Sequence, residues 1–237
     1  MDFHPTMASH PTHRVHFVQR LVIGISLGAA LVGSALAGPP PSVEAAIAAY
    51  AADDLPTAAQ GFTRFAQQGS ALAQYNLAMM HLRNELPQAN AATAHHLLLR
   101  AARQHFVRAE LALGEFYEQG RQHRSGMPDL QQAVHWYALA AEHGSVDAQV
   151  AMGTAFYLGR GAKQDPQQAA LWFRQAATGG DVGAQYLLAS MYENGLGVDQ
   201  DLRLARYWYA AAAANGDEAA PFKVKELDAR LIQEPAL

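Results

Sequence analysis

The sequence predicts an all-α protein, a solenoid of stacked helical units. One segment recurs along the chain, and its anchor alanine falls at Ala73, Ala109, Ala148 and Ala184. The copies are 36, 39 and 36 residues apart, and each contains two stretches with apolar residues at helical spacing. A self-similarity of this period is typical of units that bury their apolar faces only by stacking on their neighbours.

Residues 1–37 predict a cleavable signal peptide. Arg14 and Arg20 precede an apolar run of 17 residues, Leu21 to Ala37, that ends in Ala-Leu-Ala. The run is at the short limit of a membrane span, and its small-residue ending suits signal peptidase, so we expect cleavage after Ala37. A retained membrane anchor is the alternative, and Met7 is an alternative start.

Three prolines at 39–41 form a stiff spacer after the predicted cleavage point. Within residues 38–53, a first helix capped by Ser42 is expected. A second helix follows from Asp54 to Gly69, and this pair would close the N-terminal end of a solenoid spanning 54–217. The repeats within it run over 73–105, 109–144, 148–180 and 184–216, and a C-terminal capping helix and tail occupy 218–237.

The second helix of every unit is expected to begin at a short polar residue that accepts from the unpaired N–H groups of the first turn. The predicted N-caps are Asp54, Asn90, Asp129, Asp165 and Asp201. Large pairs follow on the same helices and are expected to pack in the core. The best of them are Trp136-Tyr137, Trp172-Phe173 and Trp208-Tyr209.

Helix ends are marked by residues at one repeat position, where a left-handed conformation is expected. They are Gly69, His105, Gly144, Gly180 and Gly216. His105 replaces glycine and should strain or lengthen its turn. The three extra residues of the 39-residue copy fall in the loop RQHRSGMP, where insertions are tolerated.

Composition excludes several classes of function. The chain has no cysteine, which rules out disulfides, thiolate metal sites and a cysteine nucleophile. With 17 Lys and Arg against 21 Asp and Glu, it lacks the basic footprint of a nucleic-acid-binding protein. The motifs G-x-S-x-G, P-loop and H-E-x-x-H are absent, so no catalytic residue is predicted and the chain is expected not to be an enzyme. Outside the leader no histidine has a second one three or four residues away, so neither a metal site nor a cofactor is expected.

The repeat pattern resembles that of the Sel-one-like repeat (SLR) family, relatives of the tetratricopeptide repeat. Ala184 to Gly216 matches almost throughout, with Ala189 in place of the usual glycine, while residues 73–105 are degenerate. The resemblance implies an α/α solenoid of antiparallel helix pairs that wind into a right-handed superhelix with a concave groove. It also implies an adaptor or scaffold for other macromolecules.

By the same resemblance, variable positions of the first helix of each repeat would face the groove. We predict partner binding there by Tyr75, Met79, Glu115, Glu118, Thr154, Tyr157, Tyr186, Ser190, Glu193 and Asn194. This lining is aromatic and apolar with an acidic middle, which suits a peptide or helix that carries a basic residue. An ordinary solvated surface is the alternative for each single position.

The expected function is therefore that of a secreted, periplasmic scaffold whose groove binds a protein or peptide partner of the cell envelope. Contact with a membrane would occur only through an uncleaved leader. The rival hypothesis is a protein that binds or hydrolyses cell-wall glycan or exopolysaccharide. Its best resource would be Glu115 and Glu118, although no second carboxylate across a cleft is identifiable in the sequence. The oligomeric state stays open.

Overall fold

The computed structural model describes residues 42–121 and 126–233, which are helical apart from short connections. The helices are α1 Val43–Ala51, α2 Leu55–Gln67, α3 Ala71–Leu82, α4 Ala91–Ala102, α5 Val107–Glu118, α6 Leu130–Glu142, α7 Val146–Leu158, α8 Pro166–Thr178, α9 Val182–Asn194, α10 Leu202–Ala214 and α11 Ala220–Gln233. The leader predicted for 1–37, the prolines at 39–41 and part of the long loop lie outside the described residues. Within the described part, no helix is both long and apolar enough to span a membrane.

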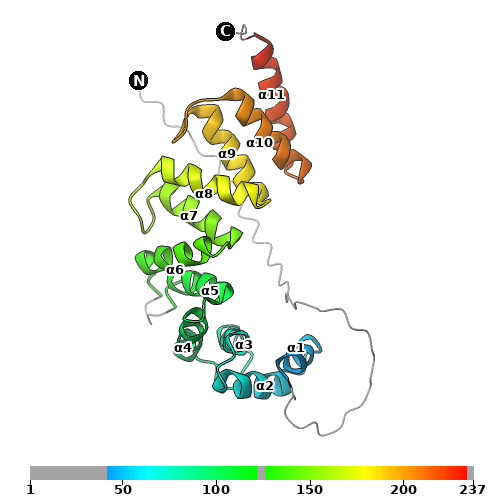
Figure 1. Cartoon of the computed structure of the whole chain (residues 1–237), viewed down its shortest axis with the longest axis vertical. Coiled ribbons are helices and arrows are strands. Elements are labelled where there is room, and N and C mark those ends of the chain that lie inside the picture. Colours follow the sequence, from blue (N-terminus) through cyan, green and yellow to red (C-terminus); the bar gives the residue numbers. More distant parts are fainter. Residues whose placement is uncertain (1–41, 122–125, 234–237) are drawn as a thin grey trace.

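The helices follow one another along an open arc, and α1 and α11 lie at its two ends on the side to which it opens (Figure 1). Each helix packs mainly against its neighbours in sequence. Between α3 and α6, the first helix of each repeat lies on the inner side of the arc and the second on the outer side (Figure 1). The prediction of an all-α solenoid is confirmed.

The predicted N-caps are confirmed for all five second helices. The side chains of Asp54, Asn90 and Asp129 each accept from the backbone N–H three residues ahead, at 3.0–3.2 Å. Asp165 and Asp201 each accept from two N–H groups, at 2.9–3.0 Å. The repeated Asp or Asn therefore determines where the outer helices begin.

The two aromatic residues of each pair differ in how deeply they are buried, which the sequence did not predict. Phe173 and Tyr209 are each 1% exposed and Tyr137 is 6% exposed, so the second aromatic residue fills the core. The tryptophan before it is only partly buried and packs at the edge of the core, as at Trp172 and Trp208. Neighbouring helical residues point about 100° apart, so the second aromatic residue faces the centre of the core and the tryptophan faces its edge. The prediction that Trp172 belongs to the buried core is wrong.

The helix ends adopt the expected left-handed conformation. Gly69, Gly144, Gly180 and Gly216 have φ between 89° and 97°. His105 occupies the equivalent position with φ 57°, which an L side chain rarely adopts. The turn thus keeps its shape, and the strain expected at His105 is present.

A buried amide column joins successive repeats. Gln74, Gln149 and Gln185 follow the anchor alanines, and each donates Nε2–H to a carbonyl eight residues earlier, at 3.1–3.4 Å. The carbonyl oxygen of Gln74 accepts from Gln104, and that of Gln185 accepts from Asn215. These bonds satisfy buried polar groups at the seam between repeats.

Candidate partner-binding site

The structure divides the ten predicted groove residues into three groups by exposure. The half-buried ones are Tyr75, Met79, Thr154, Tyr157, Tyr186 and Ser190. The exposed ones are Glu115, Glu118 and Asn194. Glu193 alone is buried, with 7% exposure.

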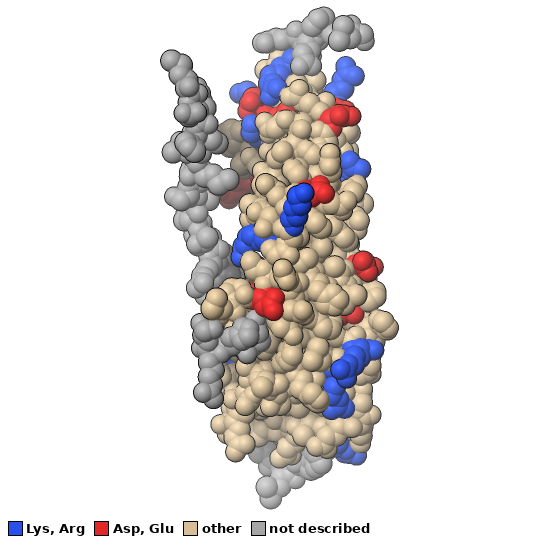
Figure 2. All heavy atoms as spheres, turned by 90° about the vertical axis from the view of Figure 1, so that its left-hand side faces the viewer, with Lys and Arg blue, Asp and Glu red and all other residues tan. Residues whose placement is uncertain are grey.

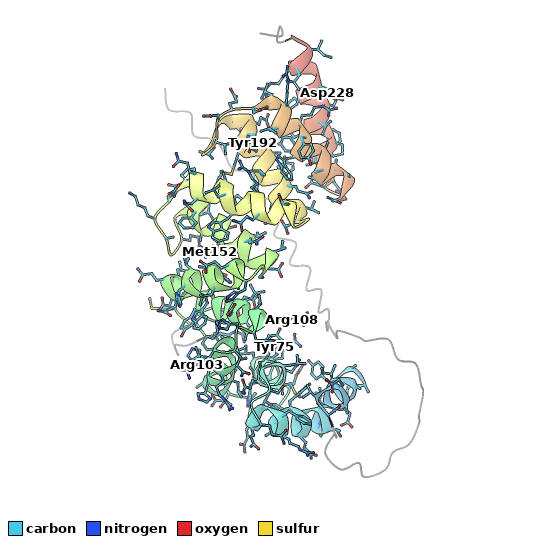
Figure 3. The ribbon with its side chains drawn as sticks, viewed as in Figure 1. Tyr75, Arg103, Arg108, Met152, Tyr192 and Asp228 are labelled. Atoms are coloured by element: carbon cyan, nitrogen blue, oxygen red, sulfur yellow. The ribbon has the colours of Figure 1, made fainter. Side chains whose placement is uncertain are left out.

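Near the N-terminal end, the inner wall is formed by α3 and α5. The Tyr75 ring lies 5.5 Å from that of Phe106, and burial is the main reason why the pKa of Tyr75 is raised. Arg108 and Arg83 lower the pKa of this phenol, whereas Glu115 raises it further. Tyr75 and Arg108 both lie on the side toward which the arc opens, whereas Arg103 lies on the outer side (Figure 3).

A pocket of ≈ 270 Å³ opens between α5, α6 and α7. Its polar lining comes from Glu118, Tyr137, Asp147, Thr154 and Arg160. The rest of the wall is apolar and mostly small, and consists of Leu130, Ala133, Val134, Val150, Ala151 and Ala155. The pocket therefore joins two predicted residues, Glu118 and Thr154, at the seam between two repeats.

The carboxylate of Glu118 is contacted by two other residues of the pocket. The Tyr137 hydroxyl donates to its Oε2 at 2.7 Å, and Arg160 Nη2 lies 3.7 Å from its Oε1. Burial of Tyr137 and its bond to Glu118 raise the pKa of the phenol, so the hydroxyl stays protonated and keeps donating. One oxygen of Glu118 is thus held by a neutral donor, and the other has only a long contact with a half-exposed guanidinium.

Glu115 extends the acidic character one turn earlier on α5. Its side chain is accessible to solvent, yet desolvation by the surrounding protein is the main reason why its pKa is raised. Repulsion from Asp147 and Glu118 adds to this rise. Asp147 is a carboxylate from the next repeat that sequence reasoning did not bring to this wall.

Glu193 occupies the same repeat position as Glu118, but it is paired within the chain. Its Oε2 accepts from the Tyr209 hydroxyl at 2.9 Å, and its Oε1 accepts from Lys223 and Arg230 at 3.2 Å each. Both basic side chains belong to α11. The structure thus places Glu193 under the C-terminal helix and does not bring it to an open surface.

A comparison of the two seams shows what the open pocket lacks. Lys223 and Arg230 stand three and ten residues after Ala220, and the corresponding residues after Ala148 are Ala151 and Leu158. At the Glu118 seam, the neighbouring helix α7 therefore offers apolar side chains where α11 offers two cations. Sequence reasoning missed Tyr137, Asp147 and Arg160 in this pocket, because they come from other helices and loops than Glu118.

The outer side of the arc has a different character. Figure 2 shows this side of the molecule, where charged side chains of both signs are scattered among uncharged ones.

A second group of polar side chains lies apart from the pocket. Within the described residues, His105, Glu110 and His143 offer ligand atoms within 4.8 Å of one another. The prediction of no metal site considered only pairs within one helix, whereas these three residues come from three segments.

The inner and outer helices, their caps and their seams define a tetratricopeptide-like repeat protein of the SLR type. The family model of the Sel1 repeat matches residues 71–106, 107–145, 146–181 and 182–217. The chain therefore belongs to the Sel1 repeat family. Each matched repeat starts two residues before our anchor alanine.

Solved structures include similar proteins. A Sel1 repeat protein from Oxalobacter formigenes is 35% identical with a TM-score of 0.65, over 72% of this chain and 49% of its own. A protective antigen of uropathogenic Escherichia coli with an SLR fold is 24% identical with a TM-score of 0.45, over 73% of this chain and 44% of its own. The chain thus spans about half the length of these two proteins. Sel1 repeat proteins are generally scaffolds for protein interactions and are generally not enzymes.

Proposed function

We propose that this protein is a scaffold that binds a partner's Lys- or Arg-containing segment along its inner wall, with Glu118 receiving the basic side chain. The observation that carries this proposal is the seam at α11. There, Lys223 and Arg230 approach Glu193 at 3.2 Å over the same Glu-Tyr pair that Glu118 and Tyr137 form. A partner would supply to Glu118 the basic side chain that α11 supplies to Glu193.

The chemistry of the pocket supports a basic occupant. A charge-assisted bond to Oε1 of Glu118, which has only the long contact with Arg160, would gain from a carboxylate already oriented by Tyr137. The apolar methyl groups of Ala151 and Ala155 would cover the aliphatic stem of a lysine or arginine. Neighbouring carboxylates at Glu115 and Asp147 add to the attraction, while Arg160 opposes it.

Selection from a phage-displayed library of random dodecapeptides tests this function directly. The bait is the full chain, and Glu118→Lys serves as the counter-bait because it reverses the charge at the pocket. We expect peptides with Lys or Arg next to an apolar residue to be enriched on the wild type and to be lost on the variant. Enrichment of acidic or neutral peptides, or equal enrichment on both baits, would contradict the assignment.

We also infer export of the protein and a partner in the periplasm. Support comes from the arginines followed by an apolar run and the Ala-Leu-Ala ending before Gly38. Cell fractionation and N-terminal sequencing of the expressed protein test this inference. Export with cleavage predicts a periplasmic chain that starts at Gly38, whereas a cytoplasmic chain that retains residues 1–37 would refute it.

Binding of cell-wall glycan is the second candidate, favoured by the grouping of Glu115, Glu118 and Asp147. The raised pKa of Glu115 is a property of a general acid, and Tyr75 supplies an aromatic ring on the same wall. However, the bond from Tyr137 and the nearby Arg160 favour the ionised form of Glu118, which is not the form of a general acid. Incubation with purified peptidoglycan strands separates the two candidates, since retention or turnover that is lost in Glu115→Gln would favour glycan.

A further inference from the structure

Three departures from the repeat pattern meet at one place. At the column of buried glutamines, the second repeat has Glu110. At the column of left-handed glycines, the turn before α5 has His105. His143 ends α6 at the repeat position that Gln104 and Asn215 hold in the first and fourth repeats. Each of those two residues donates to the buried glutamine of its own repeat.

These substitutions exchange amide chemistry for metal-ligand chemistry. Glu110 is 2% exposed, and its carboxylate has no N–H with which to continue the amide column. Instead, His143 Nδ1 lies 2.8 Å from Glu110 Oε2, and the rings of His105 and His143 meet edge to face with centroids 5.4 Å apart. Both imidazoles are exposed, so an ion could reach the group from solvent.

The geometry is close to that of a metal site. One ligand atom from each of the three residues falls within 4.8 Å of the others. Two ligands of tetrahedral zinc at about 2.0–2.1 Å are themselves about 3.3 Å apart, so small side-chain rotations would bring all three into place. Two imidazoles and one carboxylate form a ligand set that zinc accepts, with a fourth position left for water or a partner's side chain.

We propose that His105, Glu110 and His143 form a binding site for a divalent transition-metal ion, with zinc as the best-suited ion. The site would fasten the turn after α4, the first turn of α5 and the end of α6 to one another. It would therefore stiffen the seam between the repeats at 71–106 and 107–145. Hard ions such as Mg²⁺ would not bind comparably, since two of the three ligands are nitrogen.

Replacement by residues from other repeats tests the site with little risk of unfolding. His105→Gly, Glu110→Gln and His143→Asn each install a residue that the same column holds elsewhere in the chain. His96→Gln is the matched control, because His96 is exposed and lies outside the group. The measurements are calorimetric titration of each full-length chain with ZnCl2 and thermal melting with ZnCl2 or MgCl2.

We expect ZnCl2, but not MgCl2, to raise the melting temperature of the wild type and of His96→Gln. All three site variants should fold, bind one zinc fewer than the wild type and lose this rise. Histidines at 4, 10, 13 and 16 add the same background to every chain, so the comparison removes it. No zinc-dependent rise in the wild type, or the same rise and stoichiometry in Glu110→Gln, would overturn the proposal and leave a simple histidine–carboxylate pair.

Discussion

The hydroxyl of Tyr209 donates a hydrogen bond of 2.9 Å to Glu193, a residue of the preceding helix that is almost fully buried. Tyr137 and Glu118 form the same pair at 2.7 Å in another repeat. In the intervening repeat, the equivalent of the tyrosine is Phe173, which has no hydroxyl, and the equivalent of the glutamate is Tyr157, whose ring contacts Phe173. In these three repeats, a glutamate stands at this position only where a buried tyrosine hydroxyl needs a hydrogen-bond acceptor.

Removal of the Tyr209 hydroxyl should weaken the packing of α10 on α9. We expect Tyr209→Phe to lower the free energy of unfolding by about 1 kcal/mol, because Glu193 loses one donor but keeps Lys223 and Arg230. Urea denaturation measures the change. The matched control is Tyr207→Phe, a change at a residue that is 61% exposed, and an equal loss in both variants would contradict the role of the bond.

The two members of an aromatic pair should differ in their contribution to stability. Phe173→Ala should cost about 3–5 kcal/mol, because it empties a buried site that is 1% exposed. Trp172→Ala should cost less, since the indole is only partly buried. Chemical denaturation of both variants measures the difference, and a larger loss for Trp172→Ala would reverse our assignment of the core face.

Close packing of inner on outer helices depends on a residue without a side chain. A Cβ atom added at Gly153 would lie 2.6 Å from the Phe173 ring, so Gly153→Ala should destabilise the protein by about 1–3 kcal/mol. Gly183→Ala is the control, because its nearest new contact would be the Asp181 side chain at 3.4 Å. Thermal melting should separate the two variants, and unchanged stability of Gly153→Ala would mean that the helices can move apart without cost.

The stability contribution of Glu115 should depend on pH. Its folded-state pKa is raised, mainly by desolvation and then by Asp147 and Glu118, so folding favours its protonated form. The resulting stabilisation is complete below the ordinary pKa of a glutamate and is lost as pH rises through the raised value. Glu115→Gln should therefore be more stable than the wild type at pH 7, by no more than about 1 kcal/mol because the side chain is exposed. The difference in melting temperature should shrink toward pH 4, and a constant difference across this range would contradict the shift.

The sequence was sufficient for features that depend on short-range spacing. The N-caps from Asp54 to Asp201 and the left-handed position at His105 follow from the repeat period and the chemistry of helix ends. The fold class follows from the same periodicity. The periodicity does not decide whether Trp172 or Phe173 fills the core, because neighbouring helical residues differ by only about 100° in direction.

Contacts between helices were harder to predict, because they depend on residues far apart in the chain. Glu193 was assigned to the groove, but α11 covers it with Lys223 and Arg230, and no repeat motif marks those positions. Glu110 and His143 are 33 residues apart, so a search for histidines on one helix face could not find their contact. For Glu193 the decisive neighbour comes from the helix after its repeat, and for Glu110 it comes from the end of the second helix of the same repeat.

If Glu118 receives a basic side chain at the open pocket, its loss should weaken the binding of a library-selected basic peptide, which calorimetric titration measures. The titration compares the wild type, Glu118→Gln and Glu142→Gln, which removes an exposed carboxylate outside the pocket. We predict that Glu118→Gln weakens binding about tenfold or more, as expected for loss of a charge-assisted bond, while Glu142→Gln stays within about twofold of the wild type. Equal affinities for all three chains would show that Glu118 does not receive the basic side chain.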